Sequence, residues 1–215
     1  TPWRSSAASD VYKRQAVLLP GYLGSLIGFK KTFSTIAFNH LIPLLLVASS
    51  FSVIGALALI NSSDEFFIRF IPWLILVATL LFILNPNSET TTQSPKSSRL
   101  QKLGLSFVSG YGGYFNGGLG IALLSVLSLG NNFSLKQMSA IKSLLSLLIT
   151  TVSVTIFIIN GFIVWSYFLY MIIFSILGGF LGAKFTELLP TIYIRRFIIL
   201  VGLTLSGSIF INNAL

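Results

Sequence analysis

The sequence has little charge for its length and no cysteine. Its 215 residues hold 14 Lys and Arg against 5 Asp and Glu, so only 9% are charged, whereas a soluble domain has about 25%. The absence of cysteine excludes disulfides and thiolate metal sites, and a single histidine offers no zinc cluster. The acidic residues after position 15 all fall in loops or at the ends of apolar runs, so no catalytic pair is evident. We expect no metal, no cofactor and no enzymatic activity.

Apolar residues make up 54% of the chain, and the mean hydropathy is +0.88. Runs of about 20 apolar residues bounded by charges are typical of helices that cross a lipid bilayer. The composition therefore predicts an all-α, polytopic protein of the plasma membrane. The excess of basic residues fits positively charged cytoplasmic loops better than nucleic-acid binding.

Residues 1–15, TPWRSSAASDVYKRQ, differ from everything that follows. They are polar and lack the apolar core of a signal peptide. Ser5–Gln15 equals the translation of a transposase-based sequencing adapter, codon for codon. We interpret residues 1–15 as a non-native leader, with Ala16 beginning inside the natural protein.

The remaining chain divides into apolar spans and polar connections. The expected spans are 16–29, 41–61, 66–84, 103–135, 143–183 (divided at Asn160-Gly161) and 191–212. A polar linker, rich in Ser, Thr and Pro, covers 85–102.

The two halves repeat weakly. FFIRFIPWLILV at 66–77 is similar to IYIRRFIILV at 192–201, and a Gly-Ala step precedes each, at Gly55 and Gly182. Internal repeats are common in secondary transporters. We expect a truncated first repeat over 16–84 and a second repeat over 103–215.

Counting basic residues tests how 103–130 meets the membrane. If this segment crosses once, the two sides collect five and six basic residues, which is no bias. If it enters and returns to one side, the count becomes ten against one, with only Arg69 on the minority side. The positive-inside rule favours the second arrangement. It predicts a re-entrant hairpin over 103–130 with GYGGYFNGGLG at its tip, a cytoplasmic linker, inverted repeats and an external C-terminus.

Several motifs resemble the sulfite exporter TauE/SafE family of membrane transporters. They are SGYGGYFNGGLGIALLSVLSLG with the following LKQMSAIKSLLSLL, GGFLGAKFTELLP before the last helix, and IPLLLVASSFSVIGALALI with FFIRFIPWLILVATLLF in the first half. The resemblance implies export of sulfite or small organosulfonates driven by a proton or sodium gradient. It also implies an earlier Gly-rich hairpin that would precede Ala16.

The candidate substrate-binding residues lie at the hairpin tip and on the following helix. They are Gly112, Gly113, Asn116, Gly117, Gly118, Ser139, Lys142 and Ser143. Freed amides at the tip and a lysine nearby suit an anion. The alternatives are that the glycines serve helix packing, that Asn116 caps a half-helix and that Lys142 is an interfacial lysine.

A secondary transporter of small anions is the function that these features favour. An anion channel and a non-transporting membrane scaffold remain alternatives, because no residue in the sequence separates them.

Overall fold

The computed structural model describes residues 7–61, 73, 76, 79–80, 83, 95–130, 133–161 and 168–214. Within these residues the chain is helical and contains no strand. The helices are α1 (Ala7–Gly28), α2 (Lys30–Phe33), α3 (Phe38–Ile60), α5 (Pro95–Tyr114), α6 (Leu119–Leu129), α7 (Leu135–Ile159), α8 (Phe168–Leu188) and α9 (Thr191–Ala214). The all-α architecture predicted from composition is confirmed.

Three of these segments are long and apolar enough to cross a membrane: Phe38–Ile60, Leu135–Ile159 and Met171–Leu188. Their outward faces are apolar as well. Leu46 and Ile54 on α3 and Phe174 on α8 are at least 60% exposed. In water such surfaces would be unfavourable, whereas lipid accommodates them. The helices and their exposed faces are those of a polytopic membrane protein.

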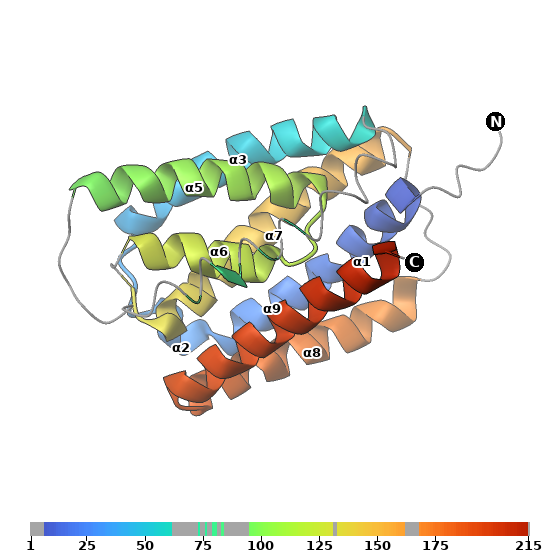
Figure 1. Cartoon of the computed structure of the whole chain (residues 1–215). Helices are drawn as coiled ribbons and strands as arrows, with labels where there is room; N and C mark the ends of the chain where they lie inside the picture. Colours follow the sequence, from blue (N-terminus) through green and yellow to red (C-terminus); the bar gives the residue numbers. More distant parts are fainter. Residues whose placement is uncertain are drawn as a thin grey trace.

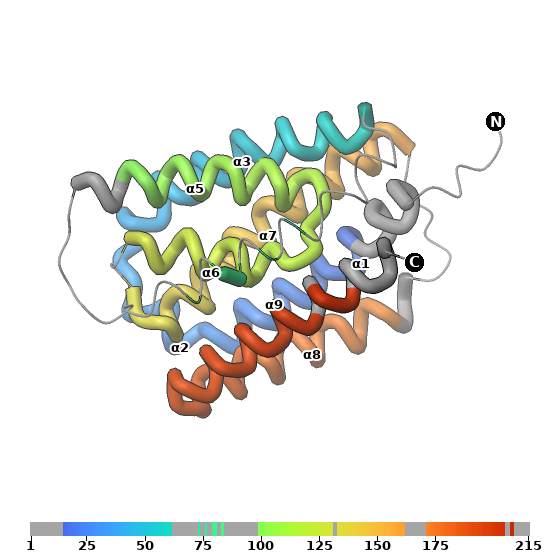
Figure 2. The backbone as a smooth tube through the Cα atoms, in the orientation of Figure 1, coloured from blue at the N-terminus to red at the C-terminus, as the bar shows by residue number. Residues whose placement is uncertain are grey.

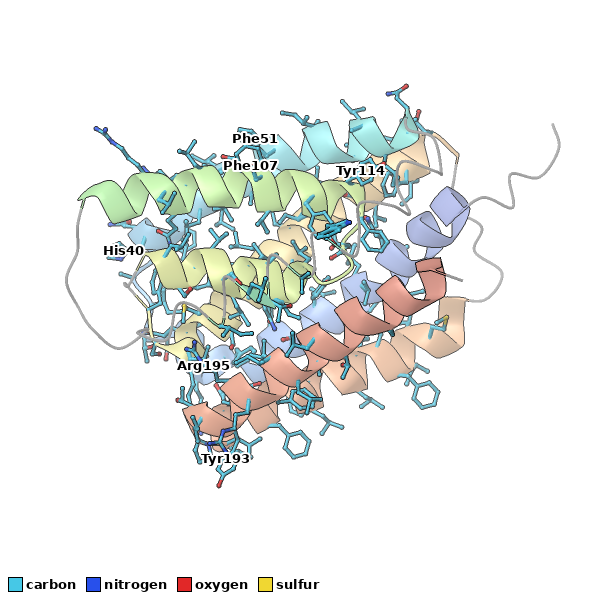
Figure 3. All side chains as sticks on the ribbon, viewed as in Figure 1. His40, Phe51, Phe107, Tyr114, Tyr193 and Arg195 are labelled. Atoms are coloured by element: carbon cyan, nitrogen blue, oxygen red, sulfur yellow. The ribbon has the colours of Figure 1, made fainter. Side chains whose placement is uncertain are left out.

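The helices run along a shared direction (Figure 1). α3 and α5 form one side of the bundle, α6 and α7 lie in the middle, and α1, α8 and α9 form the other side. His40 and Arg195 lie toward the end from which α5 starts, and Tyr114 lies toward the opposite end (Figure 3). α7 also starts at the His40 end, where Ser134 and Gln137 form a reciprocal capping box.

α5 and α6 form an antiparallel helical hairpin (Figure 2). Near its open end, Gln101 donates a 3.4 Å hydrogen bond from Nε2 to the carbonyl of Leu127. One turn further on, Gly104 lies against the side chain of Val126. The chain therefore leaves and returns at the same end of the bundle. Arg99 and Lys102 consequently lie at the same end as Lys136.

The hairpin turns back before it reaches the far end of the bundle. Gly113 packs against the backbone of Ser52, which is eight residues before the end of α3 at Ile60. At 1.5 Å per residue, α3 continues for about 12 Å beyond the tip. α6 has 11 residues and is about 16 Å long, half of a hydrocarbon core.

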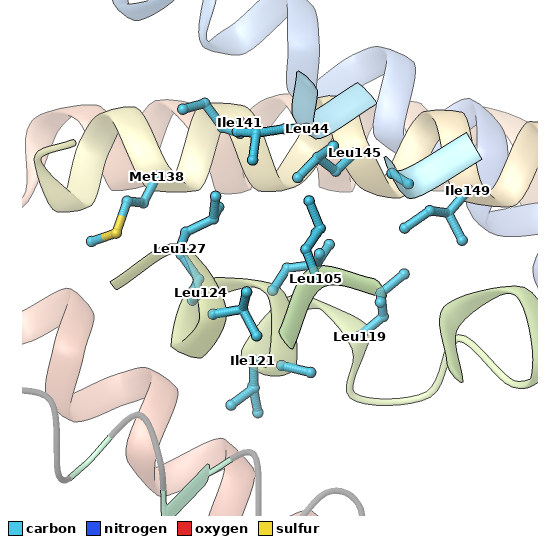
Figure 4. Close-up of a cluster of buried hydrophobic side chains, with 14 of the residues drawn as sticks. Leu44, Leu105, Leu119, Ile121, Leu124, Leu127, Met138, Ile141, Leu145 and Ile149 are labelled. Atoms are coloured by element: carbon cyan, nitrogen blue, oxygen red, sulfur yellow. The ribbon is translucent and has the colours of Figure 1, made fainter. Parts of the chain in front are cut away.

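The short helix α6 is enclosed by protein. Every residue from 121 to 128 is buried. Its leucines pack against Leu105 on α5 and against α7, where Ile141, Leu145 and Ile149 are fully buried (Figure 4). Irregular backbone at membrane depth is tolerated when protein surrounds it. The hairpin meets that condition.

Several boundaries differ from the sequence-based expectation. α5 begins at Pro95, so the end of the predicted polar linker is helical. α1 begins at Ala7, inside the segment interpreted as a leader, and its helical form does not depend on the origin of those residues. The predicted break at Asn160-Gly161 is confirmed, because α7 ends at Ile159 and Gly161 has φ of 71°. Most of the predicted span 66–84 lies outside the described residues.

α3 and α8, which the internal repeat pairs, run in opposite directions (Figure 1), as inverted repeats require. The two Gly-Ala steps differ in their surroundings. A Cβ on Gly55 would overlap the carbonyl of Gly110 on α5, whereas a Cβ on Gly182 would have open space beside it.

Candidate functional site

Two residues with left-handed backbone reverse the chain at the hairpin tip. Asn116 has φ of 66° and Gly118 has φ of 72°. Glycine adopts this conformation without strain, and asparagine tolerates it better than most other residues. The Tyr111 hydroxyl donates a hydrogen bond to the carbonyl of Gly117 and ties the tip to α5. The glycine-rich sequence is thus a tight turn between two helices.

Asn116 connects the tip to two other helices. Its side chain is buried, with 4% exposed. Its Nδ2 donates a 2.8 Å hydrogen bond to Thr150 Oγ1 on α7. Its Oδ1 accepts a 3.2 Å hydrogen bond from the Tyr22 hydroxyl on α1. Asn116 therefore fixes the tip position in the bundle, in addition to forming the turn.

Gly112 and Gly113 permit close packing around the tip. A Cβ on Gly112 would lie 2.7 Å from Leu119 Cδ1 and 3.1 Å from Ile149 Cγ2, and one on Gly113 would overlap the carbonyl of Ser52. Their Cα hydrogens face these neighbours. Only their carbonyl groups remain for contact with a ligand.

A cavity of about 440 Å³ lies between α1, α7, α8 and α9. This volume is within the range of small-molecule sites. Its polar lining comprises Tyr22, Ser25, Ser139, Lys142, Ser143, Ser175 and Thr186. Among the described residues that line it, Lys142 carries the only charge, and none is acidic.

The Lys142 ammonium approaches the N-terminus of α6. Gly120 is the second residue of that helix. A Cβ built on its backbone would lie 3.8 Å from Lys142 Nζ. No ion pair or hydrogen bond joins this ammonium to another residue in the described ranges. The Gly120 amide likewise donates to no described backbone carbonyl, whereas those of Leu119 and Ile121 are bonded within the turn. A lysine and a helix N-terminus, both favouring negative charge, converge here.

The serines of α7 extend the polar surface from Lys142. Ser139 and Ser143 are buried and line the cavity. Ser143 Oγ donates to the Ser139 carbonyl at 3.0 Å, and the hydroxyls of Ser25 and Ser143 are 2.8 Å apart. These hydroxyls join α1 to α7 at the cavity wall.

The predicted site residues fall into two adjoining groups. Ser139, Lys142 and Ser143 line the cavity, whereas Gly112, Gly113, Asn116, Gly117 and Gly118 build the tip and are absent from the cavity lining. The side chain of Tyr22 joins the groups, because it lines the cavity and donates to Asn116.

Sequence reasoning missed Tyr22, Ser25, Ser146 and Thr150. A signal for two of them was present on α7, where hydroxyl residues recur at 139, 143, 146, 150 and 153. Alternating steps of four and three place such residues on one helix face. All five are at most 3% exposed.

Apolar membrane-length helices, an enclosed half-length hairpin and an internal cavity that contains a lysine define the class of this chain as a polytopic membrane protein. The comparison with known families agrees with this class. The family model described as sulfite exporter TauE/SafE matches residues 14–209, and the chain belongs to this family. No curated protein and no solved structure gives a match.

Proposed function

We propose that this protein is a secondary transporter that exports small anions, with sulfite or small organosulfonates as substrates. Membership of a family described as sulfite exporters supports the substrate class. The observation that carries the proposal is the Lys142 ammonium next to the α6 N-terminus, which has no partner among the described residues and lies in a cavity whose described lining contains no carboxylate.

The cavity favours anions over cations or neutral solutes. A lysine within a membrane protein is unfavourable unless a counter-charge or water compensates it. A sulfonate or sulfite oxygen would accept hydrogen bonds from Lys142, from the Gly120 amide beside it and from the Ser139 hydroxyl, whereas Ser143 already donates to a backbone carbonyl. Its volume exceeds that of one bare sulfite ion, so a hydrated anion or a short organosulfonate would fit.

In this proposal the cytoplasmic end of the bundle is the one at which α2, α5 and α7 begin. The N-terminal parts of these helices carry Lys30, Arg99, Lys102 and Lys136, and basic residues are typical of cytoplasmic loops. The C-terminus of α9, which runs to the other end, then lies outside the plasma membrane. The hairpin enters from the cytoplasm and ends within the bilayer. Its tip contacts α3 at Ser52 and α7 at Thr150, part-way along both helices, and a central site in alternating access is expected at such a depth.

Sulfite binding to the purified protein tests the site. Lys142→Gln removes the charge and keeps most of the side-chain volume. A charge-assisted hydrogen bond contributes about 1.5–3 kcal/mol, so we expect sulfite to bind roughly 10- to 150-fold more weakly. Lys184→Gln is the matched control, because Lys184 lies on α8 and pairs with Glu187 outside the cavity. Equal affinities for both variants would remove Lys142 from the site.

Counterflow in proteoliposomes distinguishes the transporter from an anion channel. Unlabelled sulfite inside the vesicles should stimulate uptake of labelled sulfite. A carrier that binds the internal sulfite can return to the outward-facing state with substrate bound, and it is then ready to bind labelled sulfite. Uptake without this stimulation would identify a channel, and no specific uptake at all would favour a membrane scaffold.

A further inference from the structure

A second polar cluster adjoins the Tyr22 hydroxyl and lies outside the cavity lining. Asn116 bridges the Tyr22 hydroxyl and Thr150. Ser146 lies one helical turn before Thr150 on α7, and all three of Asn116, Ser146 and Thr150 are at most 4% exposed. The buried Ser146 hydroxyl has no hydrogen-bond partner among the described residues. A buried hydroxyl without a partner costs roughly 1–3 kcal/mol. Its retention here points to a ligand that supplies the missing partner.

The cluster adjoins the C-terminal end of α5. The carbonyls of Gly112 and Gly113, in the last turn of that helix, accept no hydrogen bond from the described residues. The C-terminus of a helix carries partial negative charge, opposite to the N-terminus of α6. The broken hairpin therefore presents a carbonyl end that favours cations and an amide end that favours anions.

The donor set of the cluster consists of neutral oxygens. The described residues contain no group of three or more acidic or histidine side chains that could hold a metal ion. Calcium and magnesium sites are built on carboxylates, whereas hydroxyl, amide and unwound backbone oxygens at broken membrane helices coordinate sodium. The chemistry favours a monovalent cation.

We propose that Asn116 Oδ1, Ser146 Oγ and Thr150 Oγ1, with carbonyls of the α5 C-terminus, bind a sodium ion at the hairpin tip. This inference rests on the proposed transport function for its purpose: the sodium ion is the coupling ion for the anion.

Tyr22 provides the connection between the two sites. Its ring lines the anion cavity, and its hydroxyl donates to Asn116 Oδ1. A sodium ion that takes Asn116 Oδ1 as a ligand changes the hydrogen bond that holds Tyr22. The position of Tyr22 at the cavity wall then depends on sodium occupancy. By linkage, sulfite and sodium alter each other's affinity by the same factor.

Sodium binding can be measured on the full chain in lipid nanodiscs. The readout is the difference in apparent melting temperature between NaCl and choline chloride at equal ionic strength. We expect a sodium-specific rise that saturates and is absent in KCl. Ser146→Ala and Thr150→Val should weaken sodium binding at least tenfold. Thr150→Ser, which keeps the hydroxyl, should retain it.

Ser153→Ala is the matched control. Ser153 is equally buried on α7, but its hydroxyl donates to the carbonyl of Ile149 in its own helix. We expect its sodium response to equal that of the parent chain. If Ser146→Ala does not fold, the Thr150→Val and Thr150→Ser pair decides the matter alone. A sodium response that is absent, or unchanged in Thr150→Val, would overturn the proposal.

The same preparation separates this inference from the proposed function. Lys142→Gln should lose the sulfite response and keep the sodium response. A sulfite response without a sodium response overturns the sodium site and leaves anion binding standing. A sodium response without a sulfite response overturns the proposed anion binding and leaves the sodium site standing.

Discussion

Alanine at Gly55 should destabilise the protein, whereas alanine at Gly182 should stabilise it. Both glycines lie inside helices, at positions that the internal repeat makes equivalent. In a helix interior, alanine is favoured over glycine by about 1 kcal/mol. At Gly182 the new methyl group meets nothing within 4 Å. We therefore expect Gly182→Ala to raise the free energy of unfolding by up to about 1 kcal/mol.

At Gly55 the packing term opposes this gain. The new Cβ would overlap the carbonyl of Gly110 and crowd the amide of Tyr114. Both are backbone atoms of a packed helix, so neither can move aside as a flexible side chain would. Overpacking of this kind costs about 1–3 kcal/mol, and the rigid neighbours favour the upper part of that range. After the alanine gain, Gly55→Ala should lose about 2 kcal/mol.

Equilibrium unfolding in mixed SDS micelles, followed by circular dichroism, measures both variants. The two substitutions are chemically identical, so their opposite signs isolate the contact between α3 and the hairpin. A loss of about 2 kcal/mol reduces the ratio of folded to unfolded protein roughly 30-fold. If Gly55→Ala is as stable as the parent chain, the close approach of Gly55 to Gly110 is refuted.

Three further predictions concern the tip, a helix cap and the topology. The Asn116→Ala variant should be less stable than Asn116→Gly by about 1 kcal/mol. Both variants lose the side-chain hydrogen bonds, but only alanine is strained at φ of 66°. Equal stabilities in the same unfolding assay would argue against the left-handed turn. Ser134→Ala removes the α7 cap and should cost about 1 kcal/mol, while Ser134→Asp should restore most of it; an unchanged midpoint for the alanine variant would count against the cap. Because the chain has no cysteine, the single variants Lys102→Cys and Asn61→Cys each carry one thiol for labelling. A membrane-impermeant maleimide added to intact cells should modify Asn61→Cys and leave Lys102→Cys unmodified. Modification of Lys102→Cys would contradict the proposed topology.

The sequence alone determined the helices, the break at Gly161 and the hairpin. These features follow from local physics. Apolar runs of bilayer length must form helices, because their backbone groups have no other partner in lipid. The distribution of basic residues favoured a segment that returns to the side it enters from for 103–130, and in the structure α5 and α6 form an antiparallel hairpin. Some boundaries differed, as at Pro95, where polar residues continue a helix beyond the apolar run.

The tertiary structure alone decided which residues share a site. Tyr22 and Asn116 are 94 positions apart, and nothing in their local sequence indicates that their side chains meet. Likewise, the approach of Lys142 to Gly120 depends on how α6 and α7 pack. Helix propensity and hydropathy act over a few residues, whereas such pairings depend on side-chain volumes and on glycine contacts between helices. The spacing of polar residues in the sequence shows which face of α7 is polar. The packing of the helices determines which residues that face contacts.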